Sequence, residues 1–369
     1  MAKTGFFWDE RCFWHGGGGN YASIVKAGGL VQPMTSGGIP ESPETKRRLK
    51  NLMDITGLTG ALEARSAPPA AWEDLLRVHP ESYLKEFKEL SDSGGGELGL
   101  QTPFGPGGFE IAAVSAGLAI GAVEAVLKGE VANAYALSRP PGHHCEPAYP
   151  NGFCLLANIA IAIETAKARH GVGRVAVVDW DVHHGNGTEA IFYDRDDVLT
   201  ISLHEEGGYP WGRGAITDRG EGRGEGFNMN LPLPPGSGQA TYLAAIDRVV
   251  LPALERFGPE LIVVACGFDA AIFDPLSRMM ASADTYRQMT LQLMQAADAL
   301  CGGRLVLVHE GGYSELYVPF CGHAAIAALA SSGIEAPDPL APVHLSRQPK
   351  GRVAEFQLSV VEDIARVLL

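Results

Sequence analysis

Apolar residues follow two different spacings along the chain from about residue 110 onward. Short apolar runs of strand length occur at 132–138, 175–180, 198–204, 227–231, 261–267 and 305–309. Longer segments with helical spacing lie between them, at 110–127, 155–170, 240–257 and 283–300. Alternating strands and helices of these lengths are typical of parallel strands covered by helices on both faces. The pattern therefore predicts a three-layer αβα fold with a mostly parallel central sheet.

The first hundred residues are less regular. The pattern predicts one helix at 44–57 and two short helices at 70–90, interrupted by a proline. The rest of residues 1 to about 60 is expected to be irregular. It contains Gly16–Gly19, which has neither of the glycine spacings that bind phosphate and is interpreted as a mobile surface loop. Residues 91–108 form a second loop, rich in glycine and proline, that is long enough to be a lid or a simple excursion.

The C-terminal segment, 337–369, begins with a proline-rich linker and ends in the amphipathic run VAEFQLSVVEDIARVLL. Such a run has one apolar face to bury, so we expect it to pack on the main domain. We therefore expect residues 1–369 to form a single domain with a C-terminal extension.

Composition limits the classes of protein that the chain can represent. Its 369 residues are 46% hydrophobic and 20% charged, which is typical of a globular protein. The formal net charge of −14 argues against a general nucleic-acid binder. The six cysteines show no CxxC spacing, no secretory signal is evident, and the most apolar segment, 111–127, is interrupted by Glu124. We expect a cytoplasmic protein with reduced thiols and without nucleic-acid or membrane partners.

The most reactive side chains follow the ends of five predicted strands. The segments there read SRPPGHHCEP, DWDVHHGNG, HEEGGYPW, GFDAAIFDPL and HEGGYSEL. Ligands of parallel α/β sheets bind beyond the carboxyl ends of the strands. We therefore expect these five segments to form one shared site.

Part of that site has the residue types of a metal centre. Asp179, Asp181 and His183 recur at every second position, which places their side chains on one face of an extended backbone. Asp269, after another predicted strand, is the natural third protein ligand to join Asp181 and His183. Three protein ligands and an open position suit catalytic zinc, and the two carboxylates also suit Fe(II) or Mn(II). The competing interpretation is that these aspartates only cap the helices that follow them.

Other residues in these segments can move protons. His143 and His144 form a pair that could act as general base and then as general acid toward a departing amine. Asp179 is placed to orient one of them. Tyr313 offers a phenol that could donate to an oxyanion, although a tyrosine after two glycines is more often a packing residue.

With these residues in view, the chain resembles a known family. The motifs RPPGHH, DWDVHHGNGT, GFDA and HEGGY are similar, in order and in spacing, to signatures of the zinc-dependent histone deacetylases, over roughly residues 40 to 330. Asn186 and Glu310 resemble its class II branch, which includes bacterial histone deacetylase-like amidohydrolases and acetylpolyamine amidohydrolases. The resemblance implies an arginase/deacetylase-like fold, in which residues 1–40 and 91–108 are variable loops.

The resemblance also implies a role for each matching position. The zinc ligands would be Asp181, His183 and Asp269, and the catalytic group would comprise His143, His144, Tyr313 and Asp179. The substrate tunnel would be lined by Phe153, Tyr209, Gly152, Leu276 and Gly311. A structural potassium ion would be bound by Asp179, Asp181, His183, Ser202 and Leu203.

The implied reaction is hydrolysis of an N-acyl amide, releasing acetate and a free amine. Zinc would acidify a water molecule and polarise the amide carbonyl. His143, assisted by His144, would take the water proton and later protonate the leaving nitrogen, while Tyr313 stabilises the oxyanion. Three departures from the family pattern leave details open, and one of them is that Tyr209 stands where many members have Phe on the second tunnel wall. Asn186 replaces a class I aspartate beside the second histidine, and Ser42-Pro43-Glu44 with Arg48 replaces the His-Pro-Glu motif linked to acetate exit.

Several alternatives remain at this point. The substrate could be an acetylated lysine, an acetylpolyamine or another small acylamine, and the chain could be a monomer or a homo-oligomer. A two-metal ureohydrolase of the arginase type would need a further bridging carboxylate, for which Asp274 is the nearby candidate. A module that binds acetyl-lysine without cleaving it is the non-enzymatic alternative.

Overall fold

The central feature of the computed structural model is an eight-stranded sheet in which every strand pairs in parallel with its neighbours. The structure describes residues 3–16, 20–21, 25–26 and 40–369. The strand order is β10-β9-β8-β11-β12-β7-β1-β4. The strands span Gly5–Phe7 (β1), Glu63–Arg65 (β4), Ala134–Ala136 (β7), Val175–Asp179 (β8), Val198–Glu205 (β9), Asn228–Leu233 (β10), Leu261–Cys266 (β11) and Leu305–His309 (β12).

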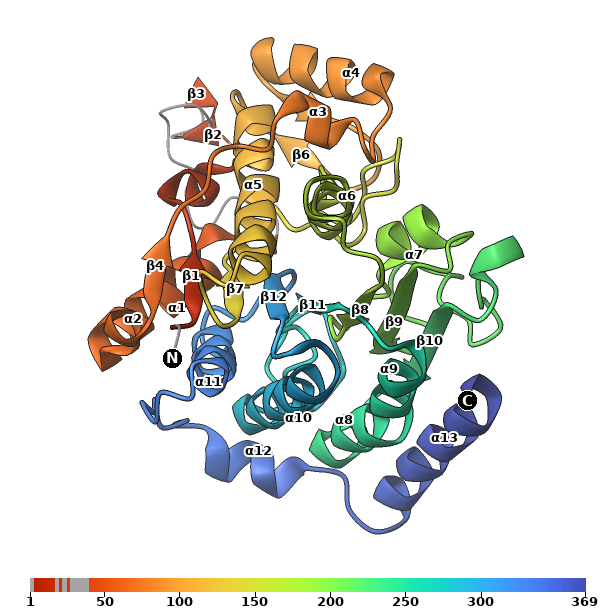
Figure 1. Cartoon of the computed structure of the whole chain (residues 1–369). Coiled ribbons are helices and arrows are strands. Elements are labelled where there is room, and N and C mark those ends of the chain that lie inside the picture. Colours follow the sequence, from red (N-terminus) through yellow and green to blue (C-terminus); the bar gives the residue numbers. More distant parts are fainter. Residues whose placement is uncertain (1–2, 17–19, 22–24, 27–39) are drawn as a thin grey trace.

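Helices cover both faces of this sheet, so the predicted three-layer αβα fold is confirmed (Figure 1). On one face lie α5 (Gly108–Leu127) and α6 (Asn158–His170), and on the other lie α10 (Ala283–Cys301) and α11 (Val318–Leu329). Successive residues of β8 alternate between the two faces. Ala176 and Val178 belong to the buried cluster beside α10 and α11, whereas Val175 and Val177 belong to the cluster beside α5 and α6. The alternation gives the protein two hydrophobic cores that share one sheet.

The remaining elements surround these layers. The other helices are α1 (Pro43–Thr56), α2 (Leu58–Ala61), α3 (Trp72–Leu75), α4 (Glu81–Asp92), α7 (Asn186–Phe192), α8 (Gln239–Ala245), α9 (Leu251–Phe257), α12 (Ala341–Arg347) and α13 (Arg352–Leu368). A π-helical segment, η3 (Ile246–Val250), joins α8 to α9, and short 3-10 segments occur at η1 (Glu10–Trp14) and η2 (Gly222–Gly224). Two small antiparallel pairs join β2 (Asn20–Tyr21) to β3 (Val25–Lys26) and β5 (Gly96–Glu97) to β6 (Pro103–Phe104).

The N-terminal segment differs from the expectation that residues 1–60 are irregular outside the predicted helix. β1 lies inside the sheet, between β7 and β4, and Phe6 is fully buried. β1 and β4 have three residues each, which is too short to display an alternating pattern along the sequence. Their membership in the sheet depends on pairing with strands that are distant in the chain. Of the predicted glycine loop, Gly17–Gly19 lie outside the described residues.

The most apolar helix, α5, is long enough and apolar enough to cross a membrane by composition alone. Within the described residues it is the one helix that meets this test, and 78% of its most apolar window is buried. It packs closely against α6, so its composition is that of a core helix in this fold.

The C-terminal helix α13 buries one face against the rest of the chain. Val361, Ile364 and Leu368 join the hydrophobic cluster that includes α8 and η3. Gln357 is also buried and accepts a hydrogen bond from the hydroxyl of Thr241 on α8. The amphipathic pattern of this segment is therefore used in packing.

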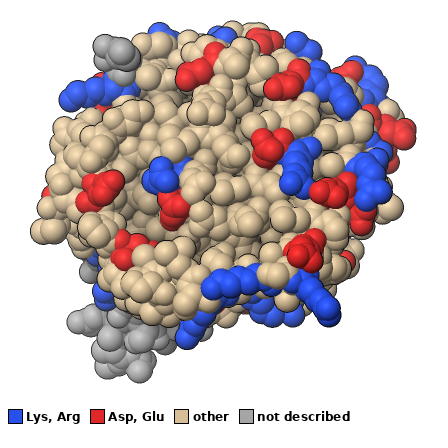
Figure 2. Space-filling view, turned by 90° about the horizontal axis from the view of Figure 1, so that it is seen from below, with Lys and Arg blue, Asp and Glu red and all other residues tan. Residues whose placement is uncertain are grey.

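Acidic and basic side chains are mixed on one face of the protein. Figure 2 shows a face on which Lys and Arg lie among Asp and Glu, with several groups of opposite sign side by side.

Candidate metal and catalytic site

Four adjacent strands deliver the residues of the site, all at their carboxyl ends. The strands are β8, β11, β12 and β7, in that order across the sheet. Asp181 and His183 follow β8, Asp269 follows β11, Tyr313 follows β12, and the histidine pair follows β7. Segments that lie up to 170 residues apart in the sequence thus meet at one edge of the sheet, as expected for parallel α/β folds.

Three metal-ligating side chains converge at the ends of β8 and β11. The Nδ1 atom of His183 lies 3.1 Å from Oδ1 of Asp181 and 3.1 Å from Oδ2 of Asp269. All three residues are buried, and their ligating atoms lie within 4.8 Å of one another. The sequence-predicted ligands are therefore brought together by the fold.

The electrostatics of this cluster favour a bound cation. Burial, and then the charge of Asp181, raise the pKa of Asp269 to about 6. Burial also opposes the charge of Asp181, but His143 and His183 outweigh it and lower the pKa of that carboxyl. Two buried carboxylates facing each other are costly unless a cation lies between them. One nitrogen and two carboxylate oxygens are a suitable ligand set for zinc, and also for Fe(II).

Backbone N–H groups fix the two carboxylates from behind. Val182 donates to Oδ1 of Asp269 over 2.8 Å, and Gly311 donates to Oδ2 of Asp181 over 2.7 Å. A Cβ atom at Gly311 would lie 2.1 Å from Oδ2 of Asp269 and 2.6 Å from Oδ2 of Asp181. Only glycine fits there, because any side chain would push the ligands aside.

The paired histidines have different hydrogen-bond partners. Nδ1 of His143 lies 2.9 Å from Oδ2 of Asp179, and Nδ1 of His144 lies 2.8 Å from Oδ1 of Asn186. The amide nitrogen of Asn186 donates to Glu146 over 3.0 Å, which orients Oδ1 of Asn186 toward His144. An amide oxygen can only accept, so Nδ1 of His144 carries the proton and its Nε2 keeps a lone pair.

Burial and neighbouring charges also shift the pKa values of the two histidines in opposite directions. Burial lowers the pKa of His143, but Asp181 and Asp179 outweigh it and raise that pKa to about 10. Burial, together with His143 and His183, lowers the pKa of His144 well below its usual value. The fold therefore favours a charged His143 beside a neutral His144.

Glu310 connects the end of β12 to the histidine loop. Its Oε2 accepts backbone N–H bonds from Gly142 over 2.7 Å and from His143 over 3.1 Å. The side chain is fully buried, and burial raises its pKa to about 7. The sequence singled out this residue only as a family signature, and its backbone contacts could not be read from the motif.

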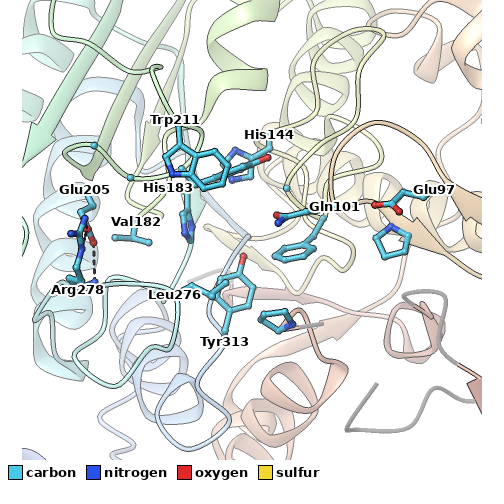
Figure 3. Close-up of a pocket in the computed structure, with 17 residues that line it drawn as sticks. Glu97, Gln101, His144, Val182, His183, Glu205, Trp211, Leu276, Arg278 and Tyr313 are labelled. Atoms are coloured by element: carbon cyan, nitrogen blue, oxygen red, sulfur yellow. Dashed lines mark hydrogen bonds and ion pairs between the residues drawn. The ribbon is translucent and has the colours of Figure 1, made fainter. Parts of the chain in front are cut away.

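A cavity of about 630 Å³ opens above the metal ligands. Figure 3 shows Tyr313 with its hydroxyl directed toward the side of His144 and His183. The predicted tunnel residues Gly152, Phe153, Tyr209 and Leu276 line this cavity, together with Trp211 and Val182 among others. Gly311 does not line it, since it lies against the ligand carboxylates instead. Trp211, which the sequence did not single out, is 74% exposed and packs edge-on against Tyr209.

The wall at Gly152 and Phe153 has an unusual backbone. Both residues have a positive φ, of 55° and 67°. A Cβ at Gly152 would lie 2.4 Å from Cδ2 of His144, so this position requires glycine on two grounds. Phe153 has no such freedom, and a phenylalanine held at positive φ is a strained feature of the kind that collects at functional sites.

The predicted potassium ligands lie behind the metal site. Asp179 on β8 and Ser202 on β9 are register partners, so their side chains are neighbours. Asp179 and Ser202 also border a small enclosed cavity with Thr188 and Thr200. Carboxylate and hydroxyl oxygens are suitable ligands for a hard cation. The backbone ligands expected at Asp181, His183 and Leu203 are not among the residues that border this cavity, and potassium stays a prediction.

The segment 42–48, which stands where the family has a motif linked to acetate exit, lies beside a buried cluster of charged residues. Ser42 caps α1, Glu44 pairs with Arg47 on the helix, and Arg48 is exposed beside Glu315. The neighbouring Glu41 is buried instead and binds Lys46 and Arg139. Arg139 is the first residue of the RPPGHH motif. This motif is the sequence feature that could have indicated a buried arginine near the site.

The chain is similar to several known proteins. A family model described as histone deacetylase domain matches residues 39–329. The chain is 59% identical over 363 residues to a histone deacetylase-like amidohydrolase of Pseudomonas aeruginosa, covering 98% of this chain and 95% of that protein. It is 38% identical to a probable deacetylase of Archaeoglobus fulgidus, covering 89% and 93% respectively.

Another relative has a substrate class in its name. The human polyamine deacetylase HDAC10 is 41% identical over 284 residues, covering 74% of this chain and 42% of that protein. Among solved structures, the HD domain of HDA15 matches 100% of this chain and 96% of its own, with a TM-score of 0.84 and 31% identity.

Proposed function

Because the chain belongs to the histone deacetylase family, we propose that it hydrolyses the acyl amide of an acetylated alkylamine, by way of one metal ion. Deacetylase activity follows from the family, and the substrate and mechanism are the proposed part. The observation that carries the mechanism is the convergence of His183 Nδ1 on Asp181 and Asp269, at 3.1 Å each, beside a cavity that reaches Tyr313.

Asp181, His183 and Asp269 would hold the ion, with zinc as the expected metal and Fe(II) as the alternative. When bound, zinc supplies a Lewis acid that polarises the amide carbonyl and makes water more acidic. Gly311 serves this arrangement by leaving room for both carboxylates and by donating its N–H to Asp181.

His144 is the better candidate for the general base. It lines the cavity, and its Nδ1–H bond to Asn186 leaves the Nε2 lone pair free to accept a proton. On sequence grounds we expect His143, assisted by His144, to take this proton. His143 is instead held by Asp179, an arrangement that stabilises an imidazolium, so we assign it electrostatic support. His144, once protonated, would donate to the leaving nitrogen.

Tyr313 would stabilise the oxyanion. Burial raises the pKa of its phenol well above the usual value, so the hydroxyl stays protonated and can donate. Its ring is held between Phe153 and His183, with centroid distances of 5.8 and 6.2 Å. A pre-oriented donor of this kind needs little reorganisation in the transition state.

The cavity walls favour an alkyl chain in front of the amide. Phe153, Tyr209 and Leu276 present mostly apolar surface, which matches the methylene chain shared by acetyl-lysine and acetylpolyamines. The named substrate of HDAC10 makes acetylpolyamines a candidate for this chain as well.

The other two functions fit the structure less well. A second metal would need Asp274, but both of its oxygens accept backbone N–H bonds, from Leu276 and Tyr313. A binding module that does not cleave acetyl-lysine would have no use for Tyr313 and both histidines in one site.

The test is a substrate panel measured as acetate or trifluoroacetate release. Acetyl-lysine peptide, N-acetylputrescine and trifluoroacetyl-lysine are compared by kcat/KM, with and without a chelator and after zinc is restored. We expect chelator-sensitive turnover of at least one of them. Binding of acetyl-lysine without chelator-sensitive turnover would instead support the binding module.

A further inference from the structure

Asp274 connects two functional parts of the cavity through one carboxylate. Its Oδ2 accepts the backbone N–H of Tyr313 over 2.7 Å, and its Oδ1 accepts the backbone N–H of Leu276 over 2.9 Å. The side chain is 7% exposed, and its own N–H donates to Ala271 over 2.9 Å, which fixes the turn that carries it. Leu276 belongs to the cavity wall, whereas Tyr313 carries the phenol.

We propose that Asp274 is a positioning residue that holds Tyr313 and Leu276 in one fixed arrangement, so that the oxyanion donor and the substrate wall form a single unit. This inference rests on the proposed function and assigns a role to an acid that does not touch the substrate.

The backbone before Tyr313 explains why such an anchor is needed. Tyr313 follows Gly311 and Gly312, and Gly312 has a φ of 127°. Two glycines in succession give the chain wide conformational freedom and little resistance to rotation. The N–H of Tyr313, which follows directly, is held by Asp274. Gly311 is fixed by its bonds to Asp181 and Phe268, so the bond to Asp274 anchors the backbone on the other side of Gly312.

Both side-chain oxygens of Asp274 are used as acceptors at this position. An ionised aspartate accepts two N–H bonds, one at each oxygen. An asparagine has the same shape but only one acceptor oxygen, so its NH₂ group would face one of the two donors. Asp274→Asn should therefore release either Tyr313 or Leu276 without opening a cavity.

The experiment is a double-mutant cycle with Asp274→Asn, Tyr313→Phe and the double variant. Each protein is measured for kcat and KM on the best substrate of the panel, for metal content and for thermal unfolding. Asp218→Asn is the matched control, because Asp218 also accepts a backbone N–H, from Ala215, and does not line the cavity. Misplacing a reacting group by about 1 Å can cost as much as 100-fold, so we expect Asp274→Asn to lower kcat by roughly 10- to 100-fold with metal retained.

The cycle separates positioning from a general structural effect. If Asp274 acts through Tyr313, Asp274→Asn should change kcat by less than about twofold once the phenol is gone. An equal loss in both backgrounds, or a normal kcat in the single variant, would overturn the inference. If Asp274→Asn does not fold, Asp274→Glu keeps the charge, displaces both oxygens and is run through the same cycle. Wild-type turnover that depends on metal and on Tyr313 would leave the proposed function standing in either case.

Discussion

Nδ1 of His144 lies 2.8 Å from the amide oxygen of Asn186, whereas Nδ1 of the adjacent His143 lies 2.9 Å from a carboxylate oxygen of Asp179. Two neighbouring imidazoles with centroids 3.9 Å apart thus have a neutral and a charged partner. This difference is the basis for assigning His144 as the base.

The first prediction concerns Asn186→Asp. A negative charge beside His144 stabilises its protonated form, so the pKa of His144 should rise and the acidic limb of the kcat/KM profile should move to higher pH. The profile is measured from pH 5 to 9, with Asp179→Asn as the counterpart at His143. If the acidic limb of the profile shifts in Asp179→Asn and not in Asn186→Asp, then His143 is the base and not His144.

Tyr313→Phe removes the proposed oxyanion donor and little else. Loss of one such donor typically costs about 10²–10³ in kcat. We expect a loss in this range, with the metal content and the thermal midpoint unchanged. Near-normal turnover in this variant would remove Tyr313 from the mechanism.

Gly311→Ala should weaken metal binding, because the new Cβ would meet both ligand carboxylates. Changes that disturb ligand orientation typically cost 10–100-fold in metal affinity, and we expect a loss of about this size in competition with a chelator. Gly60→Ala is the control, since a Cβ at Gly60 on α2 meets nothing within 4 Å. Unchanged affinity in Gly311→Ala would show that the ligands tolerate displacement.

Glu41→Gln should destabilise the protein strongly. Glu41 is 2% exposed and lies 3.0 Å from Lys46 and 2.9 Å from Arg139. Removing one partner of such a buried group typically costs about 3–5 kcal/mol in the free energy of unfolding. Glu315→Gln is the control at the exposed pair with Arg48, where little change is expected.

The same cluster predicts a pH dependence. Burial opposes the charge of Glu41, but Arg139 and Lys46 outweigh it and lower the pKa of this carboxyl from its ordinary value of 4.5. A lowered folded-state pKa gives stability above the unfolded-state pKa that is lost as the pH falls. The difference in unfolding free energy between the wild type and Glu41→Gln should therefore be constant near pH 7 and shrink below about pH 4.5. A difference that grows as the pH falls would contradict the ion cluster.

Much of the architecture was predictable because the strands near the site are buried and consist mainly of apolar residues. β8, β9, β11 and β12 have five to eight residues each and are buried along their whole length. The residues that follow such strands are fixed at one sheet edge by topology, which explains why Asp181, His183 and Asp269 could be proposed together from sequence.

The features that were missed depend on contacts between distant segments. β1 has only three residues and gains its place from pairing with β4 and β7. Glu41 could not be connected to Arg139 by any local pattern, since 98 residues separate them. From its spacing Asp274 is a candidate ligand for a second metal, because the sequence does not show that both of its oxygens accept backbone N–H bonds.

Metal content and acetate release, measured on the same preparations of the wild type and Asp269→Ala, test the account most directly. The account predicts one zinc or iron ion per wild-type chain, turnover that is lost with this ion and regained with zinc, and loss of both in Asp269→Ala. Undiminished acetate release from metal-free protein, or from Asp269→Ala, would contradict it.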